Sequence, residues 1–65
     1  MQVTWKARIK EKGNASILTP VYVCSESVSG EYVIKLFGLE NDDVEWYELE
    51  CWKNGSLYLY AGGQS

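Results

Sequence analysis

Hydrophobic and polar residues alternate along the first patterned segment of the chain, residues 2–11. The hydrophobic positions are Val3, Trp5, Ala7 and Ile9, and the polar positions between them are Thr4, Lys6, Arg8 and Lys10. Successive side chains of a β-strand point to opposite faces of a sheet. The alternation therefore predicts a strand with one buried face and one exposed face.

A second hydrophobic segment, residues 16–25, contains the only proline of the chain, Pro20. Proline has no backbone N–H to donate to a neighbouring strand, so it is confined to sheet edges, bulges and strand ends. The segment therefore predicts a second strand that lies at an edge, is bulged, or is broken at Thr19-Pro20.

The middle of the chain predicts a polar loop at residues 25–30, a third strand at residues 31–37 and a turn at residues 41–43. Tyr32, Ile34 and Leu36 occupy alternate positions of the third segment, and we expect them to face the interior. Gly38 is expected to end this strand or to form a bulge. No segment shows hydrophobic residues at helical spacing over three turns, and no Ser, Thr or Asp precedes such a run as a cap, so no helix is predicted.

Residues 44–61 are the most strongly patterned part of the chain and predict one long β-hairpin. Asn54-Gly55 lies at its centre. These residues suit a two-residue type I′ turn, because both central positions of that turn need φ > 0. This turn would pair Glu50 with Leu59 and place Glu48 and Glu50 on a face with leucines.

A three-residue loop at residues 53–55, with Gly55 in the left-handed conformation, is the alternative. It places hydrophobic side chains together on one face: Tyr47, Leu49, Cys51, Leu57 and Leu59. The opposite face then carries Trp46, Glu48, Glu50, Trp52, Tyr58 and Tyr60. We favour this register because an unpaired buried carboxylate is strongly destabilising.

These segments predict an all-β fold in a single small domain, residues 1–65. Five short strands joined by short links favour an antiparallel meander curled into an SH3-like or OB-like barrel, since closure leaves few strand edges open. An open sheet of this size would expose an apolar face and would need a partner chain to cover it. Residues 61–65 are expected to fray.

Composition and charge narrow the range of possible functions. Hydrophobic residues make up 46% of the chain, which argues against disorder. The net charge of −3 argues against duplex nucleic acid as a partner, because duplex binding needs a basic surface. The basic row of Lys6, Arg8 and Lys10 is interpreted as the polar face of a strand that pairs with Glu48 or Glu50, with phosphate contact as the alternative.

The residues of catalytic and metal sites are scarce. The chain contains no histidine, and its two cysteines, Cys24 and Cys51, cannot complete a four-ligand zinc site. We therefore predict no enzyme, no cofactor and no metal, and we expect both cysteines to be free and buried. No signal-peptide pattern or membrane-span length occurs, so a cytosolic location without membrane contact is expected.

The aromatic residues of the hairpin suggest binding. In the favoured register Trp46, Trp52, Tyr58 and Tyr60 share a face with Glu48 and Glu50, and large exposed aromatics are typical of interface centres. We predict a protein-binding module whose partner is another protein or a second copy of the chain in a homodimer. Two alternatives stay open: the loop at residues 25–30 covers the aromatics, or the face binds single-stranded nucleic acid or carbohydrate by stacking.

Overall fold

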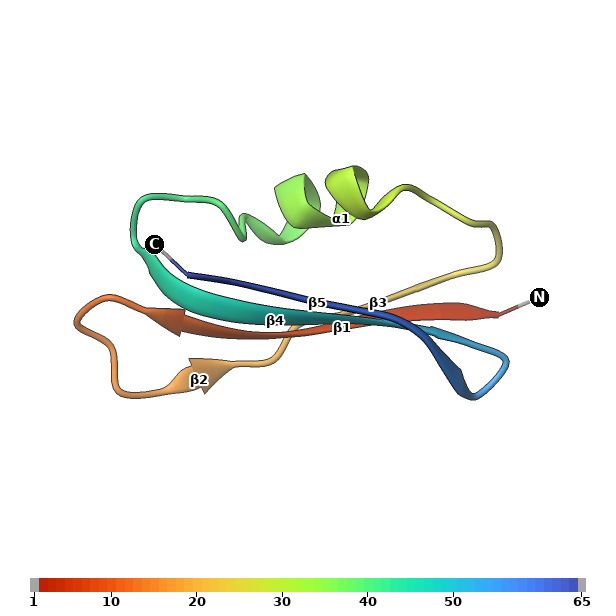
Figure 1. Ribbon diagram of the computed structural model, residues 1–65, viewed down its shortest axis with the longest axis horizontal. Helices are drawn as coiled ribbons and strands as arrows, with labels where there is room; N and C mark the ends of the chain where they lie inside the picture. The colour runs from red at the N-terminus through yellow and green to blue at the C-terminus, as the bar shows by residue number, and fades with distance from the viewer. Residues whose placement is uncertain (1, 65) are drawn as a thin grey trace.

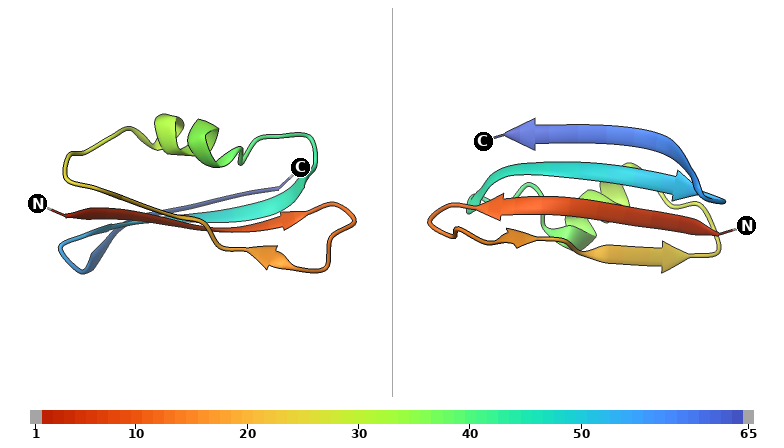
Figure 2. Two further views of the ribbon diagram at one scale, coloured as in Figure 1. Left: turned by 180° about the vertical axis from the view of Figure 1, so that it is seen from behind. Right: turned by 90° about the horizontal axis from the view of Figure 1, so that it is seen from below.

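The computed structural model describes residues 2–64 as an antiparallel sheet with one helix on one of its faces (Figure 1). The elements in chain order are β1 (Val3–Glu11), β2 (Ile17–Leu18), β3 (Val21–Cys24), α1 (Gly30–Phe37), β4 (Val44–Lys53) and β5 (Ser56–Gln64). The strand order is β2-β1-β4-β5, and β3 also pairs with β1, beside β2. Figure 2 shows β2 and β3 following one another along the same edge of the sheet.

The predicted alternation in β1 is confirmed. Val3, Trp5, Ala7 and Ile9 are each at most 5% exposed and form the centre of the core. They lie on the face that α1 covers, where Val33 of the helix and Leu39 just after it are also buried. The helix therefore shields one face of the sheet, while no element within residues 2–64 covers the other face (Figures 1 and 2).

Pro20 breaks the second strand and lies at an edge, as two of the three sequence alternatives predict. β2 ends at Leu18 and β3 begins at Val21, and both pair with β1. The Ala7 N–H donates to the Pro20 carbonyl at 3.1 Å, so hydrogen bonding to β1 continues through the break. The missing N–H of Pro20 does not interrupt pairing, because its carbonyl is the group that β1 uses.

The third predicted strand, residues 31–37, is wrong, because this segment forms α1. The Ser29 hydroxyl accepts a hydrogen bond from the Tyr32 N–H at 3.1 Å, which caps the helix N-terminus. Gly38 ends the helix with φ of 68°, and the Leu39 N–H bonds back to the Ile34 carbonyl at 2.9 Å. This is the Schellman arrangement, which uses glycine at the left-handed position.

The helix overturns the predicted facing of Tyr32 and Leu36, whereas Ile34 packs against the core as predicted. Tyr32 and Leu36, expected inside, are 50% and 49% exposed, whereas Val33 is fully buried. Residues three and four apart share a helix face, so Val33 and Phe37 contact the core together with Ile34.

The favoured hairpin turn is also wrong. Asn54 and Gly55 have φ of 50° and 82°, which makes a two-residue turn that pairs Trp52 with Leu57. The register shifts between Cys51 and Trp52, so that one extra residue of β5, Tyr58, lies opposite the junction. Beyond this bulge Cys51 pairs with Leu59.

The bulge restores the predicted faces for the rest of the hairpin. Leu49 and Cys51 are each 1% exposed on the helix side, and Glu50 pairs with Tyr60 on the opposite face. Only the side chains of Leu57 and Tyr58 are exchanged relative to the prediction. The carboxylates thus avoid burial through a bulge in β5 and not through a longer turn.

The fold is mainly β and its sheet is antiparallel, as expected. Because the sheet is open, a barrel and a simple meander are not confirmed. The chain crosses from β3 through α1 to β4, and β4 then pairs with β1 along its whole length. Residues 61–64, expected to fray, are paired with β4 within β5, and Ser65 lies outside the described residues.

None of the described residues forms a helix with the length and apolar character needed to span a membrane.

Candidate functional site

The face of the sheet that points away from α1, here called the outer face, carries the candidate site. Its members follow from strand alternation and pairing with β1, whose buried residues point to the helix. They are Thr4, Lys6, Arg8, Lys10, Ile17, Val21, Val23, Trp46, Glu48, Glu50, Trp52, Leu57 and Tyr60. All five strands thus contribute side chains to one surface.

The structure brings together five of the six residues predicted for binding. Trp46, Glu48, Glu50 and Trp52 lie at alternate positions of β4, and Tyr60 lies beside Glu50 on β5. Tyr58 does not join them. The two-residue turn places it on the helix side, where the ammonium of Lys53 lies 3.7 Å from the centre of its ring.

The loop at residues 25–30 does not cover the aromatics of the outer face. Ser27 and Val28 line a cavity of about 170 Å³ on the helix side, together with Val3 and Trp5 of the core. Tyr58 is the only predicted binding residue that lines this cavity. The proposed covering by this loop is therefore wrong for Trp46, Trp52 and Tyr60.

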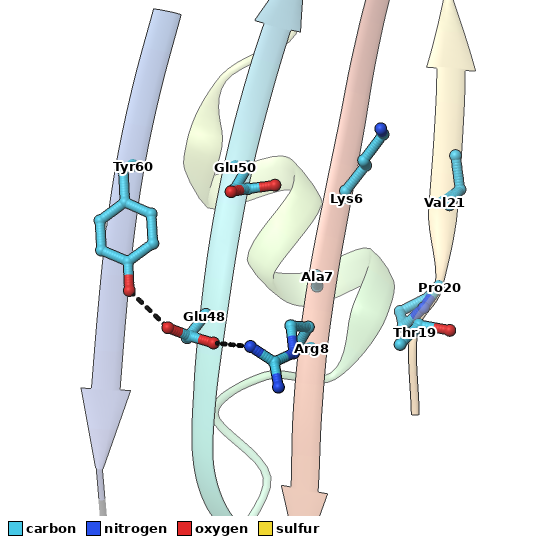
Figure 3. A pocket seen from close by; sticks show the side chains of 9 residues that line it. All are labelled: Lys6, Ala7, Arg8, Thr19, Pro20, Val21, Glu48, Glu50 and Tyr60. Atoms are coloured by element: carbon cyan, nitrogen blue, oxygen red, sulfur yellow. Dashed lines mark hydrogen bonds and ion pairs between the residues drawn. The ribbon is translucent and has the colours of Figure 1, made fainter. Parts of the chain in front are cut away.

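Glu48 joins three strands of the outer face (Figure 3). One carboxylate oxygen lies 2.9 Å from Nη1 of Arg8 on β1, and the other accepts a hydrogen bond of 2.6 Å from the Tyr60 hydroxyl on β5. The Arg8 side chain is 60% exposed, so this ion pair contributes at most about 1 kcal/mol. The contacts hold all three side chains in defined positions.

The hydrogen bond to Glu48 also raises the pKa of Tyr60 above its ordinary value. Only the protonated phenol can donate to the carboxylate, which is the largest cause of the shift. Partial desolvation and the negative charges of Glu48 and Glu50 act in the same direction, and Arg8 opposes them.

Trp52 is held by a second set of polar contacts. Its indole Nε1–H donates to Glu50 at 3.2 Å, and the Lys6 ammonium lies 5.4 Å from the centre of its ring. A cation over a tryptophan face is attracted by the negative charge of the π-system. Trp52 is therefore a half-buried aromatic in a fixed orientation.

Paired outer-face residues on neighbouring strands form rows that run across the sheet, here called rungs. One rung is Val21, Lys6, Glu50 and Tyr60. The next is Val23, Thr4, Trp52 and Leu57. On the other side of the first rung Arg8 pairs with Glu48. The centre of the face thus has a basic row on β1 beside an acidic row on β4, with apolar side chains on the outer strands.

A hollow of about 400 Å³ lies over this centre, between β3 and β5. Its lining includes Lys6, Arg8, Val21, Glu50 and Tyr60, which Figure 3 shows on the side of the sheet opposite α1. Basic, acidic and apolar groups are all within reach of a molecule that enters it. This mixture suits contact with another surface of mixed character.

No cluster of three or more histidine, cysteine or acidic side chains that could hold a metal ion occurs between residues 2 and 64. Both cysteines are free; Cys51 is buried as predicted, whereas Cys24 is only partly buried. Burial raises the pKa of the Cys51 thiol, and the nearby charge of Lys53 opposes that effect. A raised pKa disfavours the reactive thiolate at neutral pH.

The sequence anticipated the pairing of the basic row with Glu48 or Glu50, and the Arg8 contact confirms it. The contribution of Val21, Val23 and Leu57 was missed. Val21 and Val23 alternate with the partly buried Tyr22 and Cys24, so the signal was present once the face of β3 was known. For Leu57 the signal was Asn54-Gly55, because the two-residue turn pairs Leu57 with Trp52 and so places it on the outer face.

No family model, curated protein or solved structure matches this chain.

Proposed function

We propose that this chain is a non-enzymatic protein-binding module whose contact surface is the outer face of its open sheet. The observation that carries the proposal is the exposure of large apolar side chains on that face. Val21, Val23, Leu57 and Tyr60 are each 51% to 58% exposed. Val21 and Val23 lie at one edge of the face and Leu57 and Tyr60 at the other. Several large exposed apolar side chains on one face are typical of interaction sites.

Trp46, Trp52 and Tyr60 are the expected anchors of binding, because tryptophan and tyrosine dominate the energetics of interface centres. Trp52 and Tyr60 are already held by Glu50 and Glu48. Side chains that are ordered before binding lose less entropy when a partner arrives. The acidic residues therefore support the anchors as well as contributing charge.

The arrangement of charge favours protein over single-stranded nucleic acid. Lys6 and Arg8 lie directly beside Glu50 and Glu48, so phosphate groups that approach the basic row also approach carboxylates. A strand-binding groove combines stacking aromatics with a positive track along the backbone. Carbohydrate stacking on Tyr60 and Trp52 stays an alternative outcome of the test, and the cytosolic location stays a prediction.

A photoreactive phenylalanine analogue placed at position 60 tests the proposal in the source cell. The matched control is the same analogue at Tyr32, which is 50% exposed on α1. We expect covalent adducts with protein from position 60 and few from position 32. Adducts with nucleic acid or glycan would support the alternative, and equal or absent protein adducts would contradict the proposal.

Trp52→Ala provides a second test. We expect it to reduce protein adduct formation from position 60 while leaving thermal unfolding nearly unchanged, because Trp52 is a half-buried outer-face residue. Trp5→Ala is the comparison, since Trp5 is 4% exposed and its loss should cost about 3–5 kcal/mol of stability.

A further inference from the structure

We propose that the partner of the outer face is a second copy of this chain, with the two sheets packed face to face about a two-fold axis that runs along the strands between β1 and β4. This inference rests on the proposed function and specifies the partner. It follows from the way the rungs of the outer face are ordered.

A half turn about such an axis reverses the order of the strands but keeps each rung at its own height. It therefore places β1 of one copy over β4 of the other, and β3 over β5. In the first rung Lys6 then faces Glu50 of the second copy, and Val21 faces its Tyr60. A two-fold axis makes each of these contacts twice.

The neighbouring rungs match in the same way. Val23 faces Leu57, and Thr4 faces Trp52. Arg8 faces Glu48, so the ion pair that each copy makes within itself gains an opposite charge from the other copy. Five apolar or aromatic residues of each copy would meet apolar or short side chains, and the two basic and two acidic residues of these pairs would each meet the opposite sign. Beyond Arg8 and Glu48, Lys10 faces Trp46 of the other copy.

Charge complementarity is the reason to choose a second copy over a partner of one sign. A purely basic partner would meet Lys6 and Arg8, and a purely acidic one would meet Glu48 and Glu50. A second copy presents the same basic and acidic rows in reversed order, so neither row faces a like charge. The apolar side chains on β3 and β5 supply the contact area, and the charged rows determine register and orientation.

The geometry is that of an aligned β-sandwich. Stacked sheets lie about 10 Å apart and cross at roughly −30°, which a small tilt of the two-fold axis provides. The helix side is not available for this packing, because α1 already covers it (Figure 1). The dimer would supply the second layer that one copy lacks.

Charge reversal at Lys6 and Glu50 tests the pairing. In a Lys6→Glu dimer, and equally in a Glu50→Lys dimer, two like-charged contacts replace two favourable ones. We expect each variant to self-associate at least about tenfold more weakly than the wild type in sedimentation equilibrium. Circular dichroism of each variant checks that the monomer is folded, since these two residues are also neighbours within one chain.

A mixture of the two variants distinguishes register from general charge effects. In the heterodimer one contact is the native Lys6–Glu50 pair, and the other joins the two reversed side chains. We expect the mixture to form a dimer close to wild-type affinity, and the double variant K6E/E50K to form a homodimer. Lys35→Glu on α1 makes the same charge change away from the outer face and should leave association unchanged.

The outcomes separate this inference from the proposed function. A wild-type chain that stays monomeric at millimolar concentration, while position 60 still forms adducts with another protein, overturns the second copy as partner and leaves the binding face intact. A dimer that ignores both reversals, or a mixture that fails to associate when each variant is folded, also overturns the inference. Absence of protein adducts from position 60 contradicts both.

Discussion

Gly63 lies directly beneath the ring of Tyr47, its partner on β4. A Cβ atom added at Gly63 would lie 2.5 Å from Cε2 of Tyr47, closer than non-bonded carbon atoms approach. The Tyr47 ring packs against the core, so it cannot move away without losing contacts. We expect Gly63→Ala to destabilise the domain by roughly 1–3 kcal/mol, as overpacking does, measured by urea unfolding.

Gly62 is the matched control for this prediction. A Cβ at Gly62 would lie 3.5 Å from the Tyr47 carbonyl oxygen, which is ordinary contact. Gly62→Ala should therefore change stability by no more than about 0.5 kcal/mol. In a Tyr47→Val background, which removes the ring, Gly63→Ala should cost little. An undiminished cost in that background would show that the ring is not the cause.

Ser29→Ala should destabilise the domain by about 0.5–2 kcal/mol, because it removes the hydroxyl that accepts the Tyr32 N–H. Helix loss should be visible by circular dichroism at lower temperature than global unfolding in the variant. Ser25→Ala changes an exposed serine of the same loop and should have a smaller effect. Equal effects of the two substitutions would argue against the cap.

Leu49→Ala should cost about 2–5 kcal/mol, the usual range for truncating a fully buried leucine. Leu49 is 1% exposed at the centre of β4, so truncating it would leave a cavity inside the core. Leu36 on α1 is 49% exposed, and Leu36→Ala is expected to stay within about 0.5 kcal/mol. The denaturant midpoints of the two variants compare these losses of stability. Similar midpoints would place Leu49 outside the core.

The Tyr60 phenol should titrate above its ordinary pKa because its hydroxyl donates to Glu48. A folded-state pKa that is raised means that this contribution to stability is complete below the unfolded pKa of about 10, and is lost as pH rises through the folded pKa. Glu48→Gln removes the charged acceptor and should lower the Tyr60 midpoint in a ¹³C-tyrosine NMR titration. Glu50→Gln should lower it less, and an unchanged midpoint in both would exclude the hydrogen bond in solution.

Local pattern alone determined the strand β1 and the segregation of side chains along β4. The period-two alternation from Val3 to Ile9 has one explanation, because only a strand places those four residues on one face. The position of Pro20 predicted a broken edge strand for an equally local reason, its missing N–H. The pairing of the basic row with the carboxylates followed from the same alternation.

Residues 31–37 show where local pattern was ambiguous. Seven residues with hydrophobic side chains at alternate positions fit a strand, yet Val33, Ile34 and Phe37 equally form a helix face. Ser29 and Gly38 were cap signals for that helix. The helix is stabilised by packing Val33 onto the apolar face of the sheet, and that face is built from strands distant in sequence, β1 and β4.

The tertiary structure alone decided the openness of the sheet and the composition of the outer face. Closure of a barrel depends on whether two edges distant in sequence meet, and no local feature of β3 or β5 encodes that meeting. The bulge at Tyr58 likewise depends on the tertiary structure. The tight turn at Asn54-Gly55 favours one strand register, and burial of Leu49 and Cys51 favours another. The turn places Leu57 on the outer face, and one extra residue in β5 then places Leu59 beside Cys51 and Tyr60 beside Glu50.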